Sequence, residues 1–173
     1  MIELERTFLA KRLPNLVSCK KTEILDIYLP SHFDRPKIRI RKNDNKFEIT
    51  KKYLASEDEF TKFVENTFDI SEGEFIALEK EIVGKRVHKT RYYYNFGGRT
   101  AEFDVFMGDL KGLVLIDFKF NREEEIYSFK MPAFCLADVT EDEVFSGGVL
   151  CGKNYKDIER HLAKYNYKRL SLR

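Results

Sequence analysis

The first residues of the chain place two carboxylates on the same side of an extended segment. In residues 2–9, Glu3 and Glu5 alternate with Ile2 and Leu4, so a strand here would have one polar and one apolar face. Like charges two residues apart repel each other unless a cation lies between them, which points to a metal ion or to Lys and Arg side chains from neighbouring strands. A strand with one face in solvent has the same pattern, and this segment alone does not separate the two interpretations.

Charged side chains recur at the same spacing in later segments. Arg39 and Arg41 share one face of a predicted strand, and so do Lys89 and Arg91. Further members of this charged set are Lys52, Glu102, Asp104, Asp117 and Lys119. A packed apolar core does not accept so many ionisable groups, because an unpaired charge is expensive to desolvate. The face that they share is therefore either wet or surrounds a polyanion and its metal ions.

The elements that must position these residues are mostly strands joined by short turns. Alternation predicts strands over residues 2–9, 22–29, 37–42, 46–52, 60–70, 85–95, 100–107 and 113–121. The strand over 60–70, which carries Glu65, has no clear inward face. Few of the strands are apolar on both faces, which favours an antiparallel sheet over a buried parallel one.

Three helix signals interrupt or follow the strands. Ser71 and Glu74 have the spacing of a capping box and predict a helix that ends near residue 82. Thr140 and Glu143 form a second such pair, and Asn154 is expected to start a helix that ends near residue 165. Residues 10–17 are expected to form a short helix or turn.

Eight strands with short connections favour a sheet that closes into a barrel. Such a barrel encloses a lumen just wide enough for side chains or one small ligand, and closure removes the exposed edges. We therefore predict a mainly β fold of the α+β type, an eight-stranded antiparallel closed β-barrel tunnel with flanking helices, as one domain over residues 1–173. An open sheet with one charged, solvated face is the alternative that the pattern leaves.

Composition narrows the classes of protein. The chain has 173 residues, of which 43% are hydrophobic, so a folded domain with a sizeable core is expected. Its 31 basic and 29 acidic residues nearly cancel, which argues against a protein held to nucleic acid by bulk charge.

Cys19, Cys135 and Cys151 form no C-x-x-C pair, so neither a disulfide framework nor a zinc site is indicated, and a reducing, cytoplasmic location is expected. No apolar run approaches the roughly 20 residues of a membrane span, and oligomeric state has no signal.

Seven short motifs follow one another in a specific order. They are Glu3-Leu4-Glu5-Arg6-Thr7, Arg39-Ile40-Arg41, Ile49-Thr50-Lys51-Lys52, Lys89-Thr90-Arg91, Glu102-Phe103-Asp104, Asp117-Phe118-Lys119 and Asp138-Val139-Thr140-Glu141-Asp142. In this order they resemble the CYTH superfamily, the triphosphate tunnel metalloenzymes that include class IV adenylate cyclases and thiamine triphosphatases. The resemblance spans residues 2 to about 162 and implies the same eight-stranded tunnel.

The resemblance also implies a metal-dependent hydrolase of an organic or inorganic triphosphate, such as tripolyphosphate, a nucleoside triphosphate or thiamine triphosphate. Catalysis on such a substrate is mostly positioning and charge neutralisation. The implied phosphate-binding residues are Arg39, Arg41, Lys52, Lys89, Arg91 and Lys119. The implied ligands of Mg²⁺ or Mn²⁺ are Glu3, Glu5 and Asp117, which with Lys52 form the catalytic set. Supporting candidates, for orienting the basic residues or completing a second ion site, are Glu65, Glu102 and Asp104.

Two residues depart from the family pattern. Thr7 stands where the family has Lys, and Lys119 stands where it has a carboxylate. An ammonium in place of a carboxylate reverses the local charge, which is expected to weaken or abolish a second metal site. The protein would then work with one ion, prefer a different substrate, or bind a phosphorylated ligand without cleaving it. A noncatalytic polyphosphate- or nucleotide-binding module and an adenylate cyclase are therefore kept as alternatives.

Overall fold

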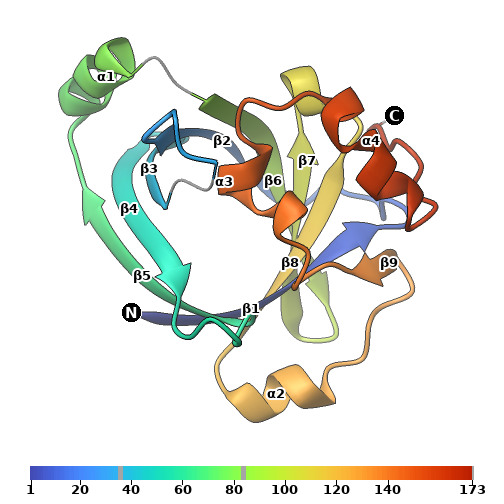
Figure 1. Ribbon diagram of the computed structural model, residues 1–173. Coiled ribbons are helices and arrows are strands. Elements are labelled where there is room, and N and C mark those ends of the chain that lie inside the picture. The colour runs from blue at the N-terminus through green and yellow to red at the C-terminus, as the bar shows by residue number, and fades with distance from the viewer. Residues whose placement is uncertain (35–36, 83–84, 173) are drawn as a thin grey trace.

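The protein is built mainly from antiparallel strands that curve around a common interior (Figure 1). The computed structural model describes residues 1–34, 37–82 and 85–172. The strands in these ranges are β1 (Ile2–Ala10), β2 (Lys20–Leu29), β3 (Ile38–Asn43), β4 (Lys46–Leu54), β5 (Lys62–Asp69), β6 (Lys85–Phe96), β7 (Arg99–Phe106), β8 (Val114–Phe120) and β9 (Cys135–Asp138).

Strand β1 closes the sheet. The strand order is β5-β4-β3-β2-β6-β7-β8-β1-β9, and β1 also pairs with β5, where Ile2 lies opposite Val64. Farther along β1, Phe8 pairs with Ile116 of β8 and with Asp138 of β9. Strands β1 to β8 therefore form a closed antiparallel barrel, as the alternation predicted. Strand β9 is not one of the eight barrel strands: it pairs antiparallel with Phe8, Leu9 and Ala10 at the end of β1. It was not predicted, because its four residues are too few to show a period.

Two helices begin where the sequence predicted them. Helix α1 (Glu72–Glu81) starts at Ser71, whose hydroxyl accepts a hydrogen bond from the Glu74 amide at 3.2 Å, while the Glu74 carboxylate accepts one from the Ser71 amide at 2.7 Å. Helix α4 (Tyr155–Ala163) has the same reciprocal arrangement between Asn154 and Asp157. Helix α1 packs on β3 and β4, and α4 covers another side of the barrel (Figure 1).

The predicted capping box at Thr140 and Glu143 is wrong. Asp142 instead caps a 3₁₀ turn, η2 (Glu143–Phe145), and its side chain accepts from the Val144 amide at 3.2 Å. Thr140 is used elsewhere, because its hydroxyl accepts from the Thr7 amide at 3.1 Å and ties this segment to β1.

The remaining short helices were not predicted. They are α2 (Glu123–Ser128), α3 (Gly147–Leu150) and the 3₁₀ turn η1 (Gly108–Leu110). In the segment 10–17, Ala10 still belongs to β1, residues 11–12 form a bend and a turn begins at residue 17, so the segment contains no helix. None of the helices in the described ranges is long and apolar enough to span a membrane.

Apolar side chains pack mainly on the outside of the barrel. Phe8, Ile116 and Phe118 point outward from β1 and β8 and are covered by the chain around α2, including Phe134. On the other side, Phe75 of α1 packs against Ile27 and Ile40 of β2 and β3. Because side chains alternate along a strand, this outer packing leaves the charged faces turned toward the interior.

Candidate active site

A cavity of about 650 Å³ lies inside the barrel, and the charged faces of its strands line it. The lining brings together nearly all of the predicted site residues, namely Glu3, Glu5, Arg39, Arg41, Lys52, Glu65, Lys89, Arg91, Asp104, Asp117 and Lys119. Glu102, the remaining predicted residue, is outside this lining but contacts Arg91. The structure thus places Glu65 on the inward face of β5, which the sequence left undecided.

The two carboxylates of β1 share an ammonium group. Lys52 Nζ donates to Glu3 Oε2 at 2.7 Å and to Glu5 Oε1 at 2.5 Å, and Lys119 Nζ lies 2.6 Å from Glu3 Oε1. Burial opposes ionisation of Glu3, but the charges of Lys52 and Lys119 outweigh it and lower its pKa to about 2. Glu3 is therefore ionised at neutral pH and is already paired with the ammonium groups of Lys52 and Lys119.

Arg91 is fixed by three carboxylates at once. Its Nε and Nη2 donate to the two oxygens of Asp104 at 2.6 and 2.7 Å, Nη2 also donates to Asp117 at 3.1 Å, and Nη1 donates to Glu102. Lys89 donates to the same Asp104 carboxylate. Burial opposes ionisation of Asp104, yet Arg91 and Lys89 hold its pKa well below the usual range. The guanidinium is therefore held in one orientation inside the cavity.

Asp117 has the opposite electrostatic environment. Burial and the nearby charge of Asp104 raise its pKa to about 6, although Arg91 opposes this shift. The Thr7 hydroxyl donates to its Oδ1 at 2.8 Å. Within the described ranges, no three Asp, Glu, His or Cys side chains are grouped so that they could hold a metal ion together. That Glu3, Glu5 and Asp117 bind one ion stays a prediction.

Asp26 of β2 also lines the cavity, although it is not among the residues predicted from the sequence. Arg41 donates to it through Nε at 2.6 Å and Nη2 at 2.8 Å. Burial opposes ionisation of Asp26, but Arg41 lowers its pKa below the usual range. The apolar Ile24 shares its face of β2, which concealed the polar alternation. Asp26 and Arg41 have opposite charges and lie opposite each other on the neighbouring strands β2 and β3, and this pairing could have identified Asp26 as an inward-facing residue.

Arg39 is the least committed arginine of the cavity. Its Nε is buried and finds no hydrogen-bond partner in the described part of the chain. The ion pair with Glu65 is long, at 3.8 Å between Nη2 and Oε2. A buried donor without an acceptor is costly, so this guanidinium is suited to an incoming anion.

The segment that follows β9 forms part of the cavity wall. Thr140 and residues 142–148, except Val144, belong to the lining. Gly147 lies against Tyr28, and a Cβ at Gly147 would lie 2.1 Å from the Tyr28 hydroxyl oxygen. The Tyr28 hydroxyl therefore lies so close to the backbone of Gly147 that any larger residue at position 147 would clash with it.

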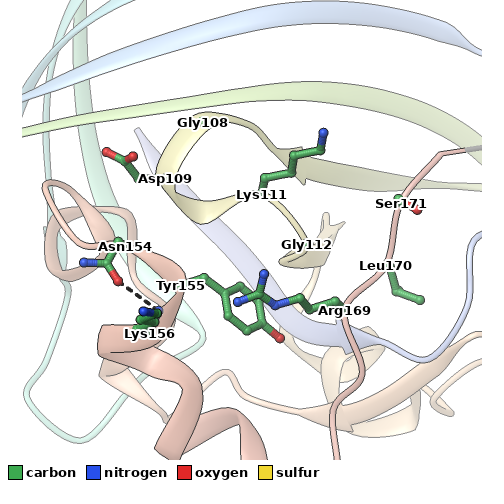
Figure 2. Close-up of a pocket in the computed structure, with 10 residues that line it drawn as sticks. All are labelled: Gly108, Asp109, Lys111, Gly112, Asn154, Tyr155, Lys156, Arg169, Leu170 and Ser171. Carbon is green, nitrogen blue, oxygen red and sulfur yellow. Dashed lines mark hydrogen bonds between the residues drawn. The ribbon is translucent and has the colours of Figure 1, made fainter.

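A second pocket, of about 600 Å³, lies between the turn after β7, the start of α4 and residues 169–171 (Figure 2). Here the Arg169 guanidinium carbon lies 3.8 Å from the centre of the Tyr155 ring. None of the predicted site residues lines this pocket, so it is distinct from the barrel cavity.

Known proteins resemble the chain over most of its length. An inorganic triphosphatase of Nitrosomonas europaea is 30% identical over 151 residues, which are 87% of this chain and 97% of the relative. An inorganic triphosphatase of Acetivibrio thermocellus is 29% identical over 129 residues, which are 73% and 80% of the two chains. A crystal structure of an inorganic triphosphatase superposes with a TM-score of 0.64 at 28% identity and covers 86% of this chain and 93% of its own. No family model matches the chain.

Proposed function

The chain belongs to the CYTH superfamily of triphosphate tunnel metalloenzymes, and on this premise we propose that it hydrolyses a triphosphate, with inorganic tripolyphosphate as the substrate. The relatives named inorganic triphosphatases support the reaction and the substrate. The observation that carries the proposal is the barrel cavity, where Arg39, Lys52 and Arg91 reach the same space from three different strands.

The charge of the cavity supports a requirement for divalent cations. Among the described residues, its lining contains more Asp and Glu side chains than Lys and Arg side chains. Tripolyphosphate carries about four negative charges, so it needs cations beyond those of the protein to enter this cavity. Mg²⁺ or Mn²⁺ would supply that charge.

Glu3 and Glu5 fit such an ion. They already share one small cation, the Lys52 ammonium, and their oxygens are the hard donors that Mg²⁺ and Mn²⁺ prefer. Mg²⁺ is commonly held by one or two carboxylates together with the phosphates of its substrate rather than by a complete protein cage. Glu3 and Glu5 would therefore hold the ion, and Asp117, which is not grouped with them in the described structure, would join them as a third ligand only in the loaded site. The ion would neutralise phosphate charge and polarise a phosphoryl oxygen.

The cationic side chains of the cavity differ in how firmly the protein's own carboxylates hold them. Arg91 is oriented by Asp104, so it presents its guanidinium without further loss of freedom. Arg39 has an unused donor for a phosphate oxygen. Lys52 bridges Glu3 and Glu5, the proposed metal ligands, and lines the cavity, so its ammonium could contact phosphate once an ion replaces it on these carboxylates.

Phosphate release tests the proposal. Tripolyphosphate, ATP and thiamine triphosphate are each incubated with Mg²⁺, Mn²⁺ or EDTA, and we expect the fastest release from tripolyphosphate with a metal. Glu5→Gln keeps the shape of the side chain but removes its charge, and it is expected to lower the rate by at least about tenfold. Lys51→Gln, at an exposed position of β4, is the control.

Three results would contradict parts of the proposal. Hydrolysis that persists in EDTA or in Glu5→Gln would exclude the metal role of Glu5. If phosphate were released from ATP but not from tripolyphosphate, tripolyphosphate would be excluded as the substrate. Formation of cyclic AMP and pyrophosphate from ATP would identify a cyclase.

A further inference from the structure

We infer that Lys119 changes partner when the cavity is loaded: it leaves Glu3 when a divalent cation binds there, and it then contacts the phosphate chain. The inference rests on the proposed function, because it takes a triphosphate as the ligand. It makes Lys119 a link between metal binding and triphosphate binding in this chain.

Glu3 holds two ammonium groups, one on each carboxylate oxygen. Lys119 lies 2.6 Å from Oε1 and Lys52 lies 2.7 Å from Oε2. Lys52 has a second carboxylate, Glu5, whereas Glu3 is the one carboxylate within ion-pair distance of Lys119 among the described residues. Loss of Glu3 to a metal ion would therefore remove the one ion pair that Lys119 forms in the described part of the chain.

The exposure of Lys119 suits a side chain that moves. Its side chain is 49% exposed, whereas the side chain of Lys52 is 23% exposed and that of Arg91 is 11% exposed. An exposed ion pair contributes little to stability, and Lys carries its charge on a flexible four-carbon stem. Exchange of partners at Lys119 is therefore inexpensive for the fold.

Electrostatics gives the direction of the exchange. A divalent cation on Glu3 repels an ammonium group that contacts the same carboxylate, so Lys119 is displaced. Glu102 also attracts the Lys119 ammonium, but it already pairs with Arg91 and lies outside the cavity lining. The oxygens of a bound triphosphate carry more negative charge and lie inside the lining to which Lys119 belongs, so they are the stronger acceptors for the released ammonium.

The exchange predicts positive coupling between the two ligands. Without metal, Lys119 is held by Glu3 and adds little to triphosphate binding. With metal, the released ammonium adds one charge-assisted contact. By linkage, the triphosphate must raise metal affinity by the same factor.

Isothermal titration calorimetry tests this coupling without turnover. Mn²⁺ and a nonhydrolysable imido analogue of tripolyphosphate are titrated singly and together, with a correction for the complex that they form in solution. Lys119→Gln is expected to raise the affinity for Mn²⁺ alone by about threefold or more, because one competing cation is gone. It should lower the affinity for the analogue about tenfold in the presence of Mn²⁺ and less than about twofold in its absence.

Two further variants serve as controls. Lys62→Gln removes an ammonium that lies 2.7 Å from the Glu123 carboxylate outside the cavity lining, and it should change none of these affinities. Lys119→Arg keeps the positive charge and should keep the coupling within about threefold of the parent.

The inference is overturned if Lys119→Gln weakens analogue binding equally with and without Mn²⁺, because Lys119 would then be a fixed phosphate ligand. It is also overturned if the variant changes neither affinity, or if the parent protein binds no analogue. Failure of the proposed function has a different signature: coupled binding in the parent protein, but no phosphate release from tripolyphosphate.

Discussion

Asp26 and Arg41 face each other across β2 and β3 and form two hydrogen bonds, at 2.6 and 2.8 Å. Their side chains are only 2% and 11% exposed. Arg41 therefore balances a buried carboxylate of the protein before any ligand arrives. A variant that removes Arg41 will affect the fold as well as any phosphate contact.

We expect Arg41→Ala to lower the free energy of unfolding by about 3–5 kcal/mol, because it leaves the Asp26 charge buried and unpaired. The double variant Asp26→Asn with Arg41→Ala should lose clearly less than the sum of the two single variants, since no unpaired charge remains. Urea unfolding at pH 7 measures both. Lys42→Ala, at an exposed position of β3, is the control and should stay within about 0.5 kcal/mol of the parent protein. Additive losses would show that the pair is not coupled.

A variant at Arg39 distinguishes an effect on ligand binding from an effect on folding better than a variant at Arg41 does. The imido analogue of tripolyphosphate with Mg²⁺ should raise the melting temperature, since a ligand at about 100 times its Kd stabilises by roughly 2.7 kcal/mol. Arg39→Ala should reduce this rise and should destabilise the unliganded protein less than Arg41→Ala does. In the described ranges Arg39 has one long ion pair, with Glu65, and a hydrogen bond with Tyr28, whereas Arg41 neutralises the buried Asp26. Lys51→Ala should leave the rise intact. Differential scanning fluorimetry compares them, and equal effects of the two variants would exclude Arg39 as a phosphate ligand.

Asp117 should make stability depend on pH in the absence of metal. Its folded-state pKa of about 6 lies above the ordinary value of 3.8, so the folded protein binds the proton more tightly than the unfolded chain. Its stabilising contribution is therefore complete below about pH 4 and is lost as the pH rises through about 6.

Asp117→Asn removes this titration. The free energy of unfolding of the parent, relative to that of the variant, should fall by roughly 1–3 kcal/mol between pH 4 and pH 7. Urea unfolding in EDTA across this range measures the difference. A difference that is constant, or that grows with pH, would refute the raised pKa.

Gly147→Ala should destabilise the protein by about 1–3 kcal/mol, because the new Cβ would lie 2.1 Å from the Tyr28 hydroxyl oxygen. Tyr28→Phe removes that oxygen, so the same glycine substitution should cost less in the Phe background. Thermal unfolding of the four proteins completes the cycle. Gly73→Ala is the control for added bulk, because its Cβ would meet its nearest neighbour at 4.0 Å; since Gly73 lies in α1, this variant should be as stable as the parent or more stable, by up to about 1 kcal/mol. Equal costs in the two backgrounds would mean that Tyr28 is not the obstacle.

The sequence by itself determined the barrel and most of its charged interior. Alternation is a local property of a strand, so it already placed Glu3 with Glu5 on one face and Arg39 with Arg41 on another. The outward packing of Phe8 and its neighbours follows from the same period. Eight strands with few buried on both faces favoured closure over an open sheet, and the pairing of β1 with β5 decided it. The capping residue Ser71 was predictable for the same reason, because its partner lies three residues away.

Only the tertiary structure decided which of these charges meet. Asp26 finds Arg41, and Lys119 finds Glu3, because strand order and register place them together. Strand β9 and the role of Thr140 depend likewise on where the later chain returns to β1. Local alternation fixes the face of a side chain, but its neighbours on that face come from strands far away in the chain, and their pairing is set by the closed sheet as a whole.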